Sequence, residues 1–308
     1  MAEFVSEIDL HVHTTASDGT MSPTAVVNYA RQKKLRAIAI TDHDTMDGLE
    51  EGIRQGEIVS LEVISGLELS LDFHKGTMHL LGYFIDPHCP ELLEKLEIAQ
   101  RYRAERNERM LQRLRDLGID IEFSEVAKLS EDGQIGRPHF ARVLVQKGNA
   151  RDIQDAFARF LRKGGPAYVE KFRFTPDEAI RCIIRAGGLP VLAHPFTLAR
   201  LDGTALDILV KELKEKGLEG IEVYYPDHTE EQSKLYHQLA QEHGLLITGG
   251  TDFHGLDKIG ADLGAAFGDT ALTYLLVERL KARRAVLFNQ GIASPCAVQG
   301  EQYGDERL

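Results

Sequence analysis

Two histidines one residue apart stand near the start of the chain, within the segment IDLHVHTTASDG at residues 8–19. Apolar and polar residues alternate in this segment. A period of two predicts a β-strand with one apolar face and one face that carries Asp9, His11 and His13. Two imidazoles on one face of a strand are well placed to bind a metal ion, and Asp18 follows on the next loop. The segment is therefore either an unusual surface strand or one wall of a metal site.

The same kinds of side chain recur where other predicted strands end. They lie in TDHD at 41–44, GLE at 66–68, AHP at 193–195 and TDFHG at 251–255, and another histidine stands near the start of the run MHLLGYFI at 78–85. Because buried carboxylates are costly to desolvate, such a group needs compensating positive charge, which divalent metal ions supply. Imidazoles and carboxylates without thiolates favour manganese, iron or zinc. The candidate metal ligands are His11, His13, Asp18, His43, Glu68, His79, His194, Asp252 and His254.

A regular alternation of strands and helices positions these side chains. Ser22-Pro23 predicts a helix that reaches about Leu35, and Thr175 with Glu178 predicts a capping box at the start of another. Continuous apolar strands between helices are typical of a parallel sheet or barrel, in which active sites lie at the carboxyl ends of the strands. Apolar runs predict strands at 8–12, 36–41, up to 70, 78–85, 189–193, 220–224 and 245–248.

The segment 87–171 interrupts this alternation and is predicted to be mostly helical. Residues 101–173 contain 16 Lys and Arg but 11 Asp and Glu, whereas the whole chain has a formal net charge of −12. This basic insertion is either a solvated helical bundle or a lid that brings positive charge to a phosphorylated substrate. The barrel is predicted to comprise 1–86 and 172–291, with 292–308 as a C-terminal tail.

Composition limits the class of protein. A chain of 308 residues, 43% of them hydrophobic, is large enough for one large domain and an insertion. The net charge of −12 argues against binding to long duplex nucleic acid or anionic membranes. No stretch approaches the roughly 18 apolar residues of a membrane span. Cys89, Cys182 and Cys296 are far apart and predict neither a disulfide framework nor a thiolate metal cluster, which fits a cytoplasmic protein.

The motifs HVH, TDHD, GLE, AHP and TDFHG, in this order, resemble those of the PHP family (polymerase and histidinol phosphatase domains) across roughly residues 5–90 and 173–290. The resemblance implies an α/β fold, a distorted (β/α)7 barrel of PHP type with a mostly helical insertion domain. It also implies three divalent metal ions per chain, with manganese expected and iron or zinc as alternatives. Three ligand sets would hold these ions: His11, His13, Glu68 and Asp252 for the first, Glu68, His79 and His194 for the second, and Asp18, His43 and His254 for the third.

The insertion sequence IGRPHF at 135–140 resembles a PHP subgroup that acts on nucleoside monophosphates and 3′,5′-bisphosphates. Some members of that subgroup are described as 5′→3′ exoribonucleases on short RNA. The resemblance implies a metal-dependent phosphoesterase whose partner is a small phosphorylated substrate, either a nucleotide or a short oligoribonucleotide. Arg137 and His139 are the candidate phosphate-binding residues, and the alternative is that both only cap an insertion helix. The oligomeric state is left open.

The chemistry expected of such a site follows from charge. Metal ions lower the pKa of bound water toward ~7 and neutralise phosphoryl oxygens, so a hydroxide that bridges two ions is expected to attack phosphorus in line. Asp9 and Asp42 are candidates for carboxylates that orient ligand histidines, and His228 is the candidate for the group that protonates the leaving oxygen. The residues expected to take part in catalysis are Glu68, Asp252, His194 and Arg137.

Other classes fit the sequence less well. Asp42 and Asp44 resemble the DxDx[TV] motif of aspartyl phosphatases, but Met46 occupies the Thr or Val position. No cysteine is followed by an arginine six residues later, as a cysteine phosphatase requires. A metal-dependent amidohydrolase shares HxH but usually lacks GLE and the late DxH pair together. Histidinol phosphate, other small phosphomonoesters and cyclic phosphodiesters are alternative substrates, and a metal-stabilised regulatory module is the non-enzymatic alternative.

Overall fold

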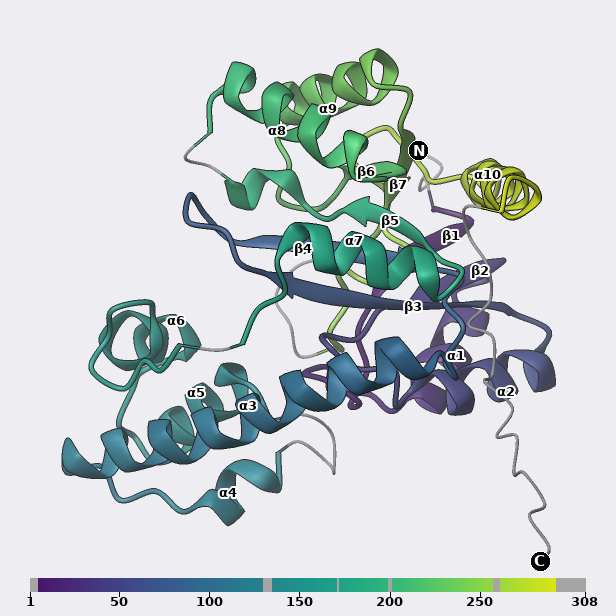
Figure 1. Cartoon of the computed structure of the whole chain (residues 1–308). Coiled ribbons are helices and arrows are strands. Elements are labelled where there is room, and N and C mark those ends of the chain that lie inside the picture. Colours follow the sequence, from purple (N-terminus) through teal and green to yellow (C-terminus); the bar gives the residue numbers. More distant parts are fainter. Residues whose placement is uncertain (1–4, 130–134, 171, 199–200, 257–260, 292–308) are drawn as a thin grey trace, which may run out of the picture.

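One seven-stranded sheet forms the centre of the protein, and its strands follow the order of the chain from β1 to β7. The computed structural model describes residues 5–129, 135–170, 172–198, 201–256 and 261–291. The sheet curls into a barrel (Figure 1), which is nearly closed where Val12 forms a parallel bridge with Phe253. The predicted α/β barrel is confirmed. Its strands are β1 (Ile8–Val12), β2 (Ala37–Ile40), β3 (Glu62–Leu71), β4 (Met78–Tyr83), β5 (Leu189–Leu192), β6 (Gly220–Tyr224) and β7 (Leu246–Gly249).

Helices cover the outside of the barrel and close one of its ends. Helix α10 (Leu275–Asn289) lies across the end where the parallel strands begin. There Arg283 pairs with Glu219 just before β6 (Nε–Oε2 2.6 Å), and Lys281 pairs with Glu62 at the start of β3 (Nζ–Oε1 2.8 Å). The outer helices are α1 (Pro23–Gln32), α2 (Leu49–Val59), α7 (Pro176–Arg185), α8 (Gly203–Glu215) and α9 (Glu230–Glu242), and η2 (Pro195–Leu198) is a short 3₁₀ helix.

The predicted helix caps are confirmed. The Ser22 hydroxyl accepts a hydrogen bond from the Ala25 amide at 3.2 Å. Thr175 and Glu178 form the reciprocal capping box, in which each backbone amide donates to the other side chain. Gly187, with φ of 74°, follows the end of α7.

Strand β4 is antiparallel to both of its neighbours, so the predicted parallel barrel is corrected at this strand. The reversal places the start of β4 at the end of the barrel where the parallel strands finish. His79 pairs in register with Ser70, near the end of β3. Because β4 runs in the opposite direction, a histidine at its beginning, His79, lies beside the other candidate ligands.

The alternation in the first strand is broken by a β-bulge. β1 gains one residue relative to β2 in the stretch that ends at Val12. Leu10 consequently packs in the apolar cluster inside the barrel, whereas Val12 packs in the outer cluster beneath the helices. The prediction of one continuous apolar face is wrong, because the extra residue in the bulge makes the side chains after it point to the opposite face of the sheet. His11 and His13 therefore face into the barrel.

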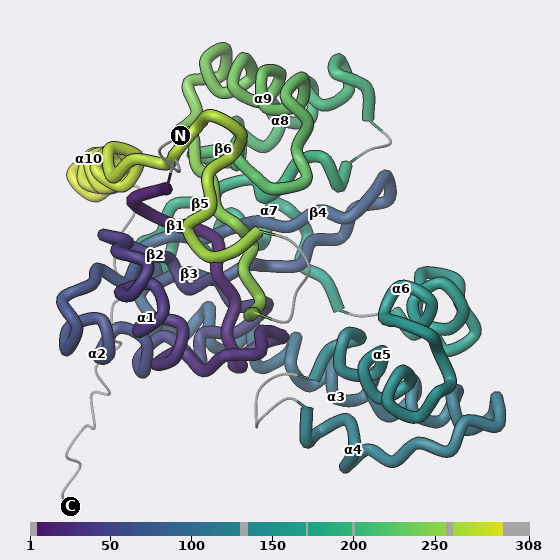
Figure 2. Tube along the Cα trace, turned by 180° about the vertical axis from the view of Figure 1, so that it is seen from behind, coloured from purple at the N-terminus to yellow at the C-terminus, as the bar shows by residue number. Residues whose placement is uncertain are grey.

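The basic insertion is helical, as expected. Its apolar side chains form a separate cluster that includes Met110, Phe140 and Leu161. Figures 1 and 2 show these helices beside the barrel, connected to it by the long α3. The boundaries 87–171 stay a prediction, and the predicted tail 292–308 lies outside the described residues. The elements are α3 (Pro90–Asp116), α4 (Phe123–Ala127), α5 (Arg137–Gln146), α6 (Ile153–Ala156) and η1 (Phe157–Leu161), a turn of π-helix.

Two further expectations concern cysteines and membranes. Cys89 is disulfide-bonded, whereas Cys182 has a free, buried thiol. The expectation that the cysteines form no disulfide framework therefore does not hold for Cys89, because spacing along the chain does not show which side chains meet. Among the helices within the described ranges, none is long and apolar enough to cross a membrane.

Candidate metal centre

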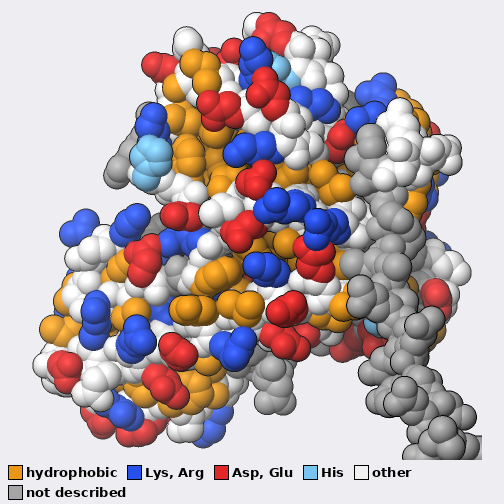
Figure 3. Space-filling view, in the orientation of Figure 1, with side chains coloured by type: hydrophobic (Ala, Val, Ile, Leu, Met, Phe, Trp, Pro, Cys, Tyr) orange, Lys and Arg blue, Asp and Glu red, His pale blue; other side chains and the backbone are white. Residues whose placement is uncertain are grey.

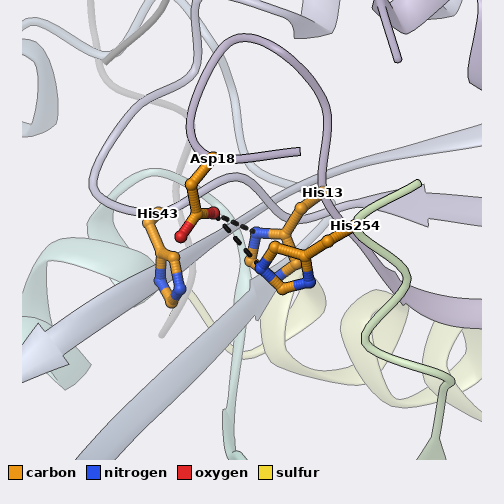
Figure 4. Close-up of side chains that lie close together, drawn as sticks. All are labelled: His13, Asp18, His43 and His254. Atoms are coloured by element: carbon orange, nitrogen blue, oxygen red, sulfur yellow. Dashed lines mark ion pairs between the residues drawn. The ribbon is translucent and has the colours of Figure 1, made fainter. Parts of the chain in front are cut away.

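All nine predicted ligands come together at the end of the barrel where the parallel strands finish. Glu68, from β3, lies at the centre, and its carboxylate is within 3.3 Å of a ring nitrogen of each of five histidines. The closest is Nδ1 of His79, at 2.7 Å from Oε1. Asp252 contacts Nε2 of His13 at 3.0 Å. Asp18 contacts Nε2 of His254 at 3.2 Å, as Figure 4 shows.

The geometry gives three groups whose ligand atoms lie within 4.8 Å of one another. The first matches the predicted set of His11, His13, Glu68 and Asp252. The second group contains His43 where the prediction has His194, and the third contains the predicted Asp18, His43 and His254 with His13 added. Nε2 of His194 lies 2.8 Å from Oε1 of Glu68, the oxygen that His79 also contacts. The three groups are: His11, His13, Glu68 and Asp252; His43, Glu68 and His79; and His13, Asp18, His43 and His254.

Contacts between ring nitrogens fit a bound cation. Nε2 of His11 lies 3.1 Å from Nε2 of His13, and two imidazole lone pairs at that distance need a proton or a metal ion between them. Ligands that bind one ion at about 2.1 Å lie roughly 3 Å apart. Nδ1 of His13 is also buried without a hydrogen-bond partner among the described residues. The donor set therefore fits divalent metal ions.

Charges within the cluster shift its pKa values strongly. Burial favours the neutral carboxyl groups, but the surrounding imidazoles outweigh it and hold the pKa of Glu68 and of Asp18 well below the usual range. Burial likewise opposes charge on His13, but Asp252 and Glu68 raise its pKa to about 10. Burial lowers the pKa of His43 to about 3. Without a metal ion, protonated imidazoles compensate the carboxylates, and a bound ion would displace those protons.

The backbone is constrained at three positions of the site. Asp44, His194 and Asp252 have φ values of 52°, 23° and 52°, in the left-handed region that non-glycine residues rarely adopt. Each of the three lies in a loop, two to four residues after the last residue of a parallel strand. Such conformations persist only where the surrounding structure holds them, and they concentrate at functional sites.

Asp9 and Asp42 do not contact the rings of the ligand histidines, so their proposed orienting role is corrected. Asp9 accepts hydrogen bonds from the Thr251 hydroxyl (2.6 Å) and from the amides of Thr251 and Gly264 (both 2.9 Å). It thereby holds the loop that carries Asp252. Asp42 similarly accepts from the Thr14 amide and hydroxyl (both 2.7 Å) and from the Ser17 hydroxyl (2.5 Å). Both carboxylates therefore hold the backbone of loops that carry candidate ligands, and neither orients an imidazole ring.

Sequence reasoning missed two residues that do contact the cluster. Glu222, in the middle of β6, is fully buried, and its carboxylate lies 3.0 Å from Nδ1 of His11. The Tyr225 hydroxyl donates to Asp252 at 2.7 Å. The signal that could have found Glu222 is an acidic residue at the centre of the apolar run GIEVY, where burial of an unpaired carboxylate is unfavourable.

A cavity of about 440 Å³ lies between the metal centre and the insertion helices. Asp18, His43 and His79 line one side of it. Figure 3 shows Lys and Arg side chains on the insertion, at lower left, and along the hollow that separates it from the barrel. Asp18 is the one carboxylate residue among the described residues that line the cavity. The cationic lining residues are Arg103, Arg106, Arg137, Arg162, Lys163 and Arg173.

Arg103 connects the insertion to the barrel. Its guanidinium forms an ion pair with Asp44, the residue after His43. The same Asp44 carboxylate accepts from the Ser70 amide at 2.8 Å and the Ser70 hydroxyl at 3.0 Å. This contact ties α3 to the loop that carries a candidate metal ligand.

The remaining predicted residues lie in different places. Arg137 lines the cavity, where its guanidinium donates to the Leu161 carbonyl at 3.2 Å and lies 5.5 Å from the centroid of the Tyr168 ring. His139 is fully buried, caps α5 by accepting from the Gly136 amide at 2.9 Å, and is not among the lining residues. A role for His139 in phosphate binding stays a prediction. The imidazole of His228 donates from Nδ1 to the Val223 carbonyl at 2.9 Å and contacts none of the nine ligands by hydrogen bond.

The barrel, the carboxylate–imidazole cluster and the adjoining basic cavity together define a metal-dependent phosphoester hydrolase. The PHP domain family matches residues 9–170. The 3′,5′-nucleoside bisphosphate phosphatase of Chromobacterium violaceum is 32% identical over 263 residues, which cover 84% of this chain and 91% of that protein. The 5′-3′ exoribonuclease Rnm of Escherichia coli is 34% identical over 250 residues, which cover 80% and 84%.

A solved structure gives the same result. A protein from Bifidobacterium adolescentis, assigned as a metal-dependent phosphoesterase, matches with a TM-score of 0.80 and 30% sequence identity. The match covers 90% of this chain and 96% of that one. The chain belongs to the PHP family.

Proposed function

We propose that this hydrolase releases phosphate from nucleotides, and that its preferred substrates carry a second phosphoryl group, as nucleoside 3′,5′-bisphosphates and the 5′ end of short RNA do. Nucleoside 5′-monophosphates are proposed as weaker substrates. The observation that supports this is the cavity that joins the metal centre to six cationic side chains. A phosphomonoester bound at the metal centre needs few of these cations, so the others are available to a second anionic group.

Arg106 is the strongest sign of a second anion. It is 4% exposed, and among the described residues no carboxylate forms an ion pair with it. Its acceptor is the Asn107 side chain, whose Oδ1 lies 2.6 Å from one guanidinium nitrogen. Burial and the neighbouring Arg103 and Arg137 lower its pKa to about 9, and the opposing effect of Asp44 and Tyr168 is smaller. A buried charge without a directly paired counter-ion is unfavourable, and a phosphoryl group in the cavity would supply that pairing.

In this proposal the chain's own residues bind, position and hold charge. The nine ligands would hold divalent ions, which we propose to be three manganese ions, with Glu68 shared between two of them. Such ions supply activated water and neutralise the reacting phosphoryl group when bound. Arg137, held by the Leu161 carbonyl, directs its remaining N–H donors toward substrate oxygens. Arg103 is positioned for the same task by Asp44.

The insertion, residues 87–171, acts in this proposal as a lid over the barrel formed by 1–86 and 172–291. Most of the cationic lining residues belong to the lid, whereas the metal ligands belong to the barrel. Binding of the second phosphoryl group and hydrolysis of the first are thus assigned to different parts of the chain.

A substrate panel tests the proposal. The metal-free protein is reconstituted with manganese and assayed against adenosine 3′,5′-bisphosphate, 5′-AMP, short 5′-phosphorylated RNA and histidinol phosphate. We expect the bisphosphate and short RNA to be hydrolysed most efficiently and a chelator to abolish all activity. Release of phosphate from histidinol phosphate alone would contradict the nucleotide assignment. Turnover that persists in the double variant His11→Ala, Asp252→Ala would contradict the role of the metal centre.

A further inference from the structure

Glu222 occupies a position between two parts of the candidate metal centre. It lies in β6, is fully buried, and uses both carboxylate oxygens. Oε1 lies 3.0 Å from Nδ1 of His11, and Oε2 accepts from the backbone amide of His194 at 2.7 Å. The ring of one candidate ligand and the backbone of another are therefore attached to the same carboxylate.

The contact to His11 sets the tautomer of its imidazole. A carboxylate accepts, so Nδ1 of His11 keeps its proton toward Glu222, and Nε2 is the nitrogen that would give up its proton when a metal ion binds. Nε2 lies 3.3 Å from Oε2 of Glu68 and 3.4 Å from Oδ1 of Asp252, inside the first ligand group. A carboxylate behind a ligand histidine also makes the opposite nitrogen a stronger donor to a metal ion.

The contact to His194 holds an unfavourable backbone conformation. The φ value of His194 is 23°, and the bond from its amide to Glu222 fixes the peptide there. This directs Nε2 of His194 toward Oε1 of Glu68, at 2.8 Å. His11 contacts one oxygen of Glu68 and His194 contacts the other. Through its own hydrogen bonds to His11 and His194, Glu222 therefore fixes the positions of residues on both sides of the Glu68 carboxylate.

We propose that Glu222 is a positioning residue that couples the metal position at His11, His13 and Asp252 to the position at His194 and His79. This inference rests on the proposed metal centre and goes beyond it, since a residue that binds neither ion is proposed to determine the metal affinity of two positions. A structural role alone would stabilise the barrel without changing metal affinity.

The variant Glu222→Gln separates these roles. Glutamine keeps the size of the side chain but offers one acceptor oxygen and one N–H₂ group, so that either His11 Nδ1–H or the His194 amide faces another donor. We expect the metal-free variant to remain folded, with its affinity for manganese reduced by about 10- to 100-fold at both positions. Two measurements check this: the number of ions retained at a fixed chelator concentration, and the rise in melting temperature on addition of manganese.

A matched control lies on the same stretch of chain. Glu219 is also a buried carboxylate, but it pairs with Arg283 at the other end of the barrel. Glu219→Gln is expected to lower the melting temperature while leaving manganese affinity unchanged. In the wild type, the NMR spectrum is expected to show a slowly exchanging His11 Nδ1 proton, and this signal is expected to be lost or shifted in Glu222→Gln.

The outcomes are distinct. Equal manganese affinity in the wild type, Glu222→Gln and Glu219→Gln would overturn the inference. Loss of affinity at one position alone would overturn the coupling. A wild type that binds no divalent ion would instead overturn the proposed metal centre, and because no phosphoester is needed, the choice of substrate does not affect the result.

Discussion

Replacement of Arg106 by methionine tests the proposed second anion most directly. The pKa of Arg106 falls from 12.5 to about 9, because burial and the neighbouring Arg103 and Arg137 disfavour its charge. This corresponds to roughly 5 kcal/mol against the charged guanidinium in the cavity without substrate. Methionine fills a similar space without the charge. We therefore expect the variant to unfold at the same temperature as the wild type or at a higher one.

Substrate binding is expected to change in the opposite direction. A hydrogen bond from a charged donor to a phosphoryl oxygen contributes about 1.5–3 kcal/mol. Its loss corresponds to a rise in KM for adenosine 3′,5′-bisphosphate of roughly 10- to 150-fold. The KM for 5′-AMP, which lacks the second group, is expected to change less than threefold. Steady-state phosphate release with manganese measures both values.

Arg101 provides the matched control for this experiment, since it is exposed on the same helix, α3, and does not line the cavity. Arg101→Met is expected to behave as the wild type with both substrates. The reasoning is refuted if Arg106→Met leaves KM for the bisphosphate unchanged, or if it raises KM for both substrates equally. A clear fall in the melting temperature of Arg106→Met would show that other groups of the protein already stabilise the charge of Arg106, which would also contradict the reasoning.

Three other changes have expected outcomes. Asp44→Ala removes the partner of Arg103 and is expected to lower the free energy of unfolding by about 3 kcal/mol, measured by urea denaturation; an unchanged midpoint would contradict this. The raised pKa of His13 stabilises the metal-free protein below pH 6.5, and this contribution is lost as the pH rises toward 10, by up to about 1.4 kcal/mol per pH unit. Melting of chelator-treated protein at pH 6.5 and 9.5 measures it, and His13→Gln is expected to reduce the difference without abolishing it, because the pKa values of His11 and His194 are also raised. At Gly250, a Cβ atom would lie 2.4 Å from the His11 amide nitrogen, so Gly250→Ala is expected to reduce soluble, folded protein and manganese binding together, whereas normal binding would show that the loop can shift.

The sequence was sufficient to find the fold class and the side chains that converge. Strands and helices alternate in its apolar pattern, and the end of each parallel strand in such a barrel lies at the same edge, so residues as distant as His11 and His254 could be expected to meet. The capping signals at Ser22 and Thr175 were equally local, because a cap involves only residues three positions apart. Local rules of this kind can be applied without coordinates.

Other features depended on contacts between distant segments. The antiparallel direction of β4, which explains the place of His79, and the bulge in β1 result from how strands pair, which apolar periodicity does not record. Cys89 shows the same limit, since its disulfide could not be inferred from spacing.

The residues that support the metal centre show the same division between sequence and structure. HVH, TDHD, GLE, AHP and TDFHG identify the candidate ligands by residue type and spacing. Three features depend on distances of a few ångströms between separate elements: which histidines share Glu68, the attachment of His11 to Glu222, and the lack of an ion pair between Arg106 and any carboxylate of the described residues. The sequence by itself determined which chemical groups are present, and only the tertiary structure decided which of them lie within reach of one another, because electrostatic and hydrogen-bonding interactions act over those short distances.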